Sequence, residues 1–208
     1  MIFHAPFVVA DCKTCIADGA ICTANGVIVA AGAYSQVQPA FPNALARHFK
    51  NAVIHPGLIN AHCHLELSLL RGKIAPGPDF AKWIKAQMAA RKSWNKNTYR
   101  YGMTQGLNEA ATAGTTTLVD ISSQHIIDPL LASPIRVIEC FETYALDPED
   151  AEKKLAEAKD VLEAAGHLKI GFGLSPHAPY TASKALYQGC FRLALLLWTY
   201  SSNQLRHS

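Results

Sequence analysis

Hydrophobic and polar positions follow two different patterns along the chain. Up to about residue 55 the pattern is typical of β-structure. The stretch GAICTANGVIVAAG holds two alternating apolar runs on either side of Asn25-Gly26, the strongest short-range signal for a β-hairpin. A Pro-rich connector, QPAFPNALA, follows Val37. We therefore predict a small β region over residues 1–55, followed by a second region over residues 56–208.

From residue 56 onward, predicted strands and helices alternate. GLINAHC, TTTLVDIS, IRVIECFETY and KIGFGLSPH are typical of strands, and residues 80–92, 98–113 and about 183–197 of helices. Strands separated by helices imply parallel βαβ units and an α/β fold class. Four such units favour either a barrel or a doubly wound sheet, and the pattern alone does not choose between them.

The helix predicted over residues 148–165 has the clearest pattern in the chain. Asp147 can cap it and Pro148 suits its first turn. Gly166 is expected to end it. Its apolar face is formed by Ala151, Leu155, Ala158, Leu162 and Ala165.

Composition and charge exclude several classes of function. Half of the 208 residues are hydrophobic and 17% are charged, as in a globular protein. The net charge is +3 and basic residues occur only in short pairs, so no nucleic-acid partner is expected. The N-terminus lacks a signal-peptide pattern, and the apolar run 193–198 is too short to span a bilayer. We expect a cytoplasmic protein with no membrane partner, whose six cysteines are free thiols.

Candidate chemistry first emerges in PGLINAHCHLELS. His62 and His64 are two residues apart at the end of a predicted strand, so both side chains should point to the same face. Two converging imidazoles suit a zinc or iron site. The HxH pattern alone is a weak signal, since surface or core histidines are more frequent. Its position at the carboxyl end of a strand, where barrel enzymes hold their active sites, strengthens the metal interpretation.

The motif PGLINAHCHLELSLLRG resembles the first-strand signature of the amidohydrolase superfamily. Within it, the resemblance is greatest to aminohydrolases that act on purines, triazines and thioadenosine-type nucleosides, including chlorohydrolases. The HLELS variant resembles aminodeoxyfutalosine deaminases more than the methylthioadenosine deaminases. VIVAAG, AGTTTLVDIS and LSPHAPYTAS agree with the same family in order and type, so the resemblance covers about residues 19–190.

This resemblance implies a (β/α)₈ TIM barrel preceded by a small β-sandwich. It also implies one zinc or iron ion, with His62 and His64 as its first two ligands. The substrate would be a small aminated heterocycle, hydrolysed at a C–N bond by a metal-activated water.

Two further residues are assigned to the substrate by the resemblance. His177, in SPHAPYT, ends the fourth strand and is expected to contact the substrate; metal ligation and a structural role are its second and third interpretations. Trp83, in DFAKWI, occupies a position where relatives place an aromatic side chain near the site. Some nucleoside deaminases carry a ribose-binding glutamate just before that tryptophan. This chain has Lys82 there, which argues against a ribosyl substrate of that type.

Glu66 and Asp120 are weaker candidates. Both lie near predicted strand ends and could accept hydrogen bonds from metal-bound histidines. A role as a helix-cap or surface carboxylate is at least as good an interpretation of each.

The sequence departs from the family after His177. No Asp or Glu follows that residue, whereas the family places an HxxE motif and a metal-binding Asp there. A (β/α)₈ barrel takes roughly 250 residues, so about four units are present and the barrel is predicted to be partial, as in a truncated family member. The alternative is a non-catalytic half-barrel with a binding or regulatory role. Open strand edges also make self-association possible.

Overall fold

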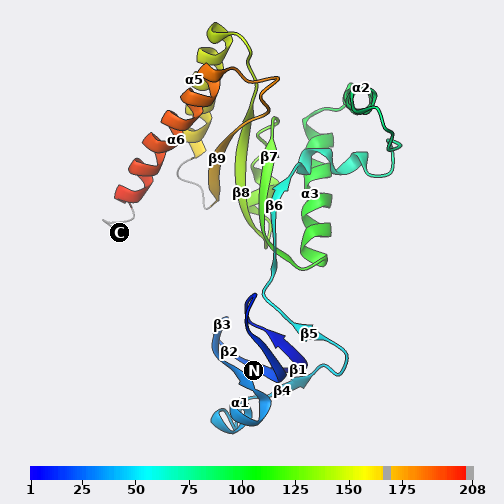
Figure 1. Cartoon of the computed structure of the whole chain (residues 1–208), viewed down its shortest axis with the longest axis vertical. Helices are drawn as coiled ribbons and strands as arrows, with labels where there is room; N and C mark the ends of the chain where they lie inside the picture. The colour runs from blue at the N-terminus through cyan, green and yellow to red at the C-terminus, as the bar shows by residue number, and fades with distance from the viewer. Residues whose placement is uncertain (166–169, 205–208) are drawn as a thin grey trace. The chain divides into compact units, whose positions relative to one another are not determined.

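The computed structural model describes residues 1–165 and 170–204. The chain folds into two compact units, Met1–Gly57 and Leu58–Ser208 (Figure 1). Gly166, which is predicted to end the helix over 148–165, lies outside the described residues, and so does the side chain of Ala165.

The first unit is built on one five-stranded sheet. The strand order is β3-β2-β1-β4, and β5 also pairs with β1. The strands are β1 (Ile2–Val9), β2 (Cys15–Ala24), β3 (Val27–Ala33), β4 (Ala46–His48) and β5 (Val53–Ile54). The predicted hairpin joins β2 to β3, and Asn25 and Gly26 have φ of 51° and 77°, as a type I′ turn requires. The described residues form a single sheet here, so a sandwich is not shown.

The Pro-rich connector is not entirely irregular. Its first residues belong to helix α1 (Tyr34–Ala40), which contains Pro39. The helix forms because Val37 is buried against Ile2, Ala20 and Cys22 of the sheet. Tertiary burial of one apolar side chain thus outweighs the proline signal.

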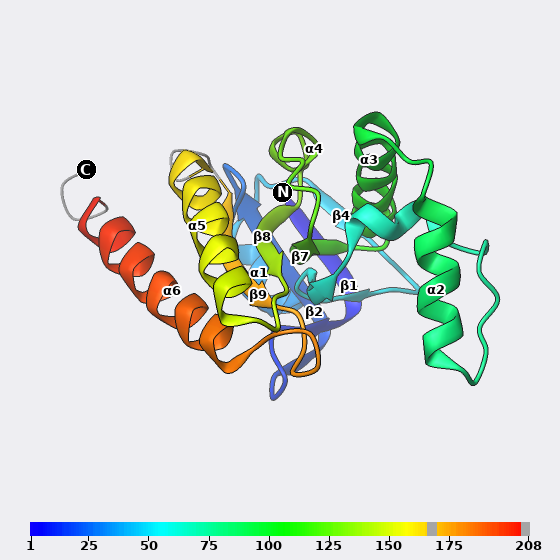
Figure 2. The same ribbon diagram turned by 90° about the horizontal axis from the view of Figure 1, so that it is seen from above.

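The second unit is a four-stranded parallel sheet in the order β6-β7-β8-β9, with helices between the strands (Figures 1 and 2). Its strands are β6 (Leu58–Cys63), β7 (Thr115–Ser122), β8 (Arg136–Thr143) and β9 (Gly171–Pro176). Its helices are η1 (Leu65–Leu70), α2 (Phe80–Arg91), α3 (Lys96–Thr112), α4 (Asp128–Leu131), α5 (Pro148–Ala165) and α6 (Lys184–Gln204). The predicted α/β architecture of parallel units is confirmed.

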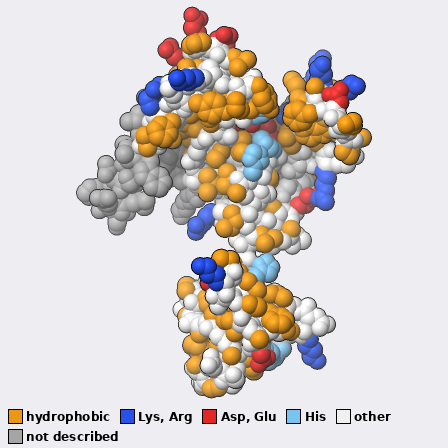
Figure 3. Space-filling model, viewed as in Figure 1, with side chains coloured by type: hydrophobic (Ala, Val, Ile, Leu, Met, Phe, Trp, Pro, Cys, Tyr) orange, Lys and Arg blue, Asp and Glu red, His pale blue; other side chains and the backbone are white. Residues whose placement is uncertain are grey.

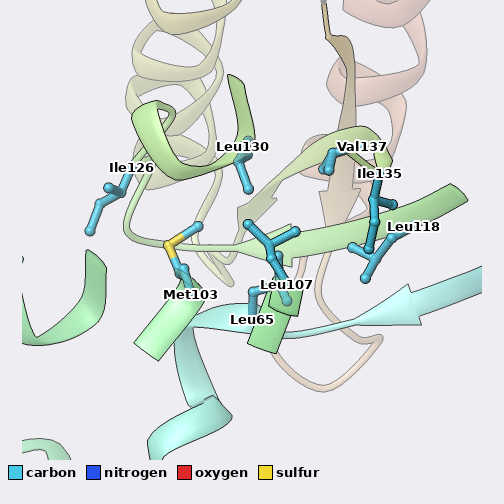
Figure 4. Packing of buried hydrophobic residues seen from close by; sticks show 8 residues of the cluster. All are labelled: Leu65, Met103, Leu107, Leu118, Ile126, Leu130, Ile135 and Val137. Atoms are coloured by element: carbon cyan, nitrogen blue, oxygen red, sulfur yellow. The ribbon is translucent and has the colours of Figure 1, made fainter. Parts of the chain in front are cut away.

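The largest core of this unit lies between the sheet and α3 and α4 (Figure 4). Eight buried side chains form it: Leu65, Met103, Leu107, Leu118, Ile126, Leu130, Ile135 and Val137. A fully buried aliphatic side chain of this size contributes about 1.5–3 kcal/mol to folding. Because Leu65 comes directly after His64, this core holds the HxH segment in place.

Helix α5 packs against α6, and the two lie side by side (Figure 2). Ala151, Ala158 and Leu162 of its predicted apolar face are buried, and Leu155 is half-buried. Among the described residues, β6 pairs only with β7 and β9 only with β8, so the sheet is open at both edges. No described helix has the length and apolar character needed to cross a membrane.

Candidate active site

His62 and His64 lie side by side at the carboxyl end of β6. Their ring centroids are 5.2 Å apart and the ring planes meet at 70°. His62 is exposed and His64 is half-buried. The backbone N–H of His62 donates to Asn60 Oδ1 at 3.2 Å, which holds this end of the strand. The two-residue spacing therefore produces the neighbouring imidazoles that it predicts.

A cavity of about 730 Å³ opens beside these histidines. Four of the six predicted site residues line it, namely His64, Glu66, Trp83 and His177, whereas His62 and Asp120 do not. The walls come from η1, α2 and the segments that follow β8 and β9. This volume lies within the range of small-molecule sites.

One wall of the cavity is apolar and aromatic. Trp83 and Phe80 stack with ring centroids 6.0 Å apart and planes at 26°. Other apolar lining comes from Leu67, Ile84, Met88, Tyr144 and Leu146. A flat aromatic ligand can bury its faces against such a wall.

His177, which also lines the cavity, is held by two contacts. Its backbone N–H donates to the Thr143 carbonyl at 3.0 Å, which ties the end of β9 to the end of β8. Its Nδ1 lies 2.7 Å from the Thr181 hydroxyl. Because Thr181 engages Nδ1, a ligand in the cavity can use Nε2.

Glu66 is buried and serves the fold, so its interpretation as a surface carboxylate is wrong. Only 3% of the residue is exposed. Its carboxylate accepts hydrogen bonds from Ser122 Oγ at 3.1 Å and from the backbone N–H groups of Ser123 and Gln124 at 3.1 and 3.2 Å. The guanidinium of Arg91 lies 3.7 Å away. Glu66 thus anchors η1 and α2 to the end of β7.

Asp120 is also buried, and the surface interpretation is wrong for it as well. Its Oδ1 accepts the backbone N–H of Leu65 at 2.7 Å. Glu139 occupies the register position beside it on β8 and is 2% exposed. Burial raises the pKa of both carboxyls, and the charge of Asp120 raises the pKa of Glu139 further. Two neighbouring buried carboxyls of this kind are stable when they hold one proton between them.

Glu66 and Asp120 bond to groups other than the imidazole rings of His62 and His64. Among the described residues, no hydrogen bond joins Glu66 or Asp120 to the ring of His62 or His64. Asp120 instead reaches the HxH segment through the backbone of Leu65.

Glu142 is a cavity residue that sequence reasoning missed. It lines the cavity with His64 and His177, and burial raises its pKa while the two histidines lower it. The signal was the two-residue period of β8. Val137, Glu139 and Phe141 are buried on one face of the strand, so Glu142 belongs to the other.

The chemistry of the donor set bears on metal binding. The two imidazoles of His62 and His64 fit two positions of a zinc or iron ion. Within residues 1–165 and 170–204, no group of three or more His, Cys, Asp or Glu side chains is arranged to hold a metal. The described residues therefore supply two protein ligands, and water or a further donor would complete the coordination.

Comparisons with known proteins identify the family of this chain. Residues 53–195 match the model of the amidohydrolase family. A 5'-deoxyadenosine deaminase of Methanococcus maripaludis is 34% identical over 152 residues, which cover 70% of this chain and 36% of the relative.

Solved structures give the same fold. The aminofutalosine deaminase of Helicobacter pylori, in complex with methylthio-coformycin, aligns with a TM-score of 0.78 at 24% identity, over 93% of this chain and 48% of that one. A zinc-bound adenosine deaminase of Xanthomonas campestris aligns with a TM-score of 0.68 at 21% identity, over 94% and 47% of the two chains. The chain thus spans about a third of that curated relative and about half of these solved structures. With most of its length matching the family model, the chain belongs to the amidohydrolase family.

Proposed function

We propose that the protein acts in the hydrolytic deamination of a small aminated heterocycle, with a purine nucleoside as the favoured substrate class. The observation that carries this proposal is one cavity that joins His64, Trp83 and His177 in a chain of the amidohydrolase family. The names of the relatives support it, since they are deaminases of 5'-deoxyadenosine, aminofutalosine and adenosine.

In this proposal His62 and His64 hold a divalent zinc or iron ion. The zinc reported for the Xanthomonas relative favours zinc. Such an ion would supply a water of lowered pKa and would polarise the C–N centre of the substrate. The exposed side of His62 leaves the approach to the ion open to solvent.

The cavity residues of this chain would orient the ring. The stacked pair Phe80 and Trp83 provides a face for the heterocycle, and His177 a hydrogen bond to one of its nitrogens. Glu142 sets a half-buried carboxylate among them, suited to accept an N–H of the aminated ring.

The proposed architecture follows the same relatives. The four parallel units of residues 56–208 would form half of a (β/α)₈ barrel, and the sheet of residues 1–55 part of a small β-sandwich. The β-sandwich part and the half-barrel would then correspond to the regions 1–55 and 56–208 that the hydrophobic pattern predicts.

A second candidate function is ligand binding without turnover. This alternative keeps the ligand-binding features of the cavity and assigns no residue to moving a proton from water to the leaving amine, a step that hydrolytic deamination requires. Under this alternative the cavity binds the heterocycle without hydrolysing it, and the bound state has a regulatory role.

One experiment separates the two functions. The zinc-loaded chain is titrated with 5'-deoxyadenosine by calorimetry, and ammonia release is measured in parallel. Both functions predict binding that Trp83→Ala weakens at least tenfold, whereas Trp94→Ala, which removes a tryptophan outside the cavity, does not. Ammonia release above a His62→Ala/His64→Ala control establishes deamination. Binding without release establishes the second function, and the absence of any binding to adenosine-type nucleosides, guanine or aminotriazines contradicts both.

A further inference from the structure

The first unit holds a cluster of titratable side chains that the proposed deamination does not use. His4 on β1 and His48 on β4 are register partners in neighbouring parallel strands. Their Nδ1 atoms are 2.8 Å apart. On the other side of the His4 ring, Nε2 is 2.7 Å from Asp18 Oδ1. Histidine side chains of this unit lie at its surface (Figure 3).

The carboxylate determines which nitrogen of His4 carries the proton. An ionised carboxylate accepts hydrogen bonds and donates none, so His4 Nε2 bears the hydrogen in the 2.7 Å contact. In the neutral ring, Nδ1 is then an unprotonated donor atom, and it faces the same atom of His48. This approach is favourable when neutral His48 carries its proton on Nδ1 and donates it to His4, or when a metal ion lies between the two nitrogens.

The surroundings match those of metal-bound histidines. A metal-bound imidazole usually gives its other N–H to a carboxylate, which fixes the orientation of the ring, and Asp18 accepts such a contact from His4 here. Asp18 has φ of 47°, a left-handed backbone that non-glycine residues adopt at a cost. The ring of Tyr34 packs on His4 with centroids 4.3 Å apart and restricts its rotation.

We propose that His4 and His48 form a two-imidazole site for a divalent transition metal such as zinc, with Asp18 as the residue that positions His4. Tetrahedral zinc with Zn–N bonds near 2.0–2.1 Å needs its nitrogens roughly 3.3 Å apart. The exposed side chain of His48 supplies the small movement from 2.8 Å. The described residues bring no third His, Cys, Asp or Glu donor to this point, so water completes the coordination and binding is reversible.

The ion would link two strands that lie far apart in the sequence. His4 and His48 are separated by 44 residues, and β4 pairs with β1 over only three register positions. Metal bound to the folded unit and not to the unfolded chain stabilises the unit in proportion to its occupancy. The site thus strengthens the short contact between β1 and β4.

The test uses the full chain with the proposed active-site ligands removed by His62→Ala and His64→Ala, and with the exposed thiols of Cys12 and Cys15 replaced by serine so that they cannot bind zinc. Zinc is titrated by calorimetry at pH 7.5, and the histidine ring nitrogens are followed by ¹⁵N NMR. We expect one ion per chain, with the His4 and His48 Nδ1 resonances shifted and the affinity at least tenfold weaker after His48→Gln. Asp18→Asn should weaken binding roughly 10–100-fold.

The matched control is His55→Gln, which removes another exposed histidine of the same unit and should leave the zinc isotherm unchanged. An isotherm that His48→Gln leaves unchanged would overturn the proposal, as would the absence of zinc binding by this background. Circular dichroism of each variant excludes unfolding as the cause of a loss. Because His62 and His64 are absent throughout, the outcome is independent of the proposed active site.

Discussion

Asp120 Oδ1 accepts a hydrogen bond from the backbone N–H of Leu65 over 2.7 Å, between two fully buried residues. Leu65 follows His64 directly, so this bond fixes the backbone at the end of the HxH segment. In the sequence, Asp120 is a candidate hydrogen-bond partner of the histidine rings. In the structure, Asp120 instead holds the backbone of Leu65, the residue that follows His64 and packs in the core.

Asp120→Ala should destabilise the second unit by about 1–3 kcal/mol, because it leaves the buried N–H of Leu65 without an acceptor. Asp120→Asn keeps an oxygen in place and should cost less. Urea unfolding monitored by circular dichroism measures both changes. Equal losses in the two variants would show that the bond to Leu65 contributes nothing measurable.

Glu139 should make the stability of the second unit depend on pH. Burial and the neighbouring Asp120 raise its pKa in the folded state above the ordinary value of 4.5. As pH rises above 4.5, the unfolded chain loses this proton while the folded unit retains it, so the free energy of unfolding falls. Glu139→Gln should flatten this dependence between pH 4.5 and 7, as measured by urea unfolding at each pH. A slope that is the same in the variant would contradict the assignment.

Gly26→Ala should destabilise the first unit by about 1 kcal/mol. Gly26 has φ of 77° in the turn between β2 and β3, a conformation that costs an L-residue with a side chain. Gly77→Ala is the matched control, because Gly77 is exposed, has no atom near its added Cβ and no left-handed φ. Thermal unfolding should separate the two variants, and equal melting temperatures would contradict the turn assignment.

The chain should self-associate through its open sheet edges. β6 is an edge strand of the described sheet, and Ile59 on it is 71% exposed. Light scattering after size exclusion should detect oligomers, and Ile59→Lys should reduce them because a charge on an edge strand opposes pairing. A monodisperse monomer over a range of concentrations would contradict this prediction.

The sequence predicted the elements well where local chemistry decides them. Asn25-Gly26 predicted the hairpin, and the β-branched run TTTLVDIS coincides with β7 (Thr115–Ser122). The connector was only partly right, because α1 continues through Pro39 while Val37 packs against the sheet. The local pattern thus predicted the type of these elements, whereas helix α1 depends on tertiary packing against the sheet.

The candidate site was predictable only in part, for a similar reason. Motifs identified His64, Trp83 and His177, which the fold brings to one cavity. Glu142 and Glu139 carry no motif, and which face of β8 each occupies depends on how the sheet packs on its helices. The environment of Glu66 and Asp120 depends on contacts more than fifty residues away in the chain.

The central claim is that His62 and His64 together bind a divalent ion at the cavity. The most direct measurement is equilibrium dialysis against zinc in the His48→Gln chain, which removes the site proposed in the first unit. We predict saturable, chelator-labile binding that His62→Ala abolishes and His55→Gln leaves unchanged. Zinc binding of the same affinity after His62→Ala and His64→Ala would contradict the account.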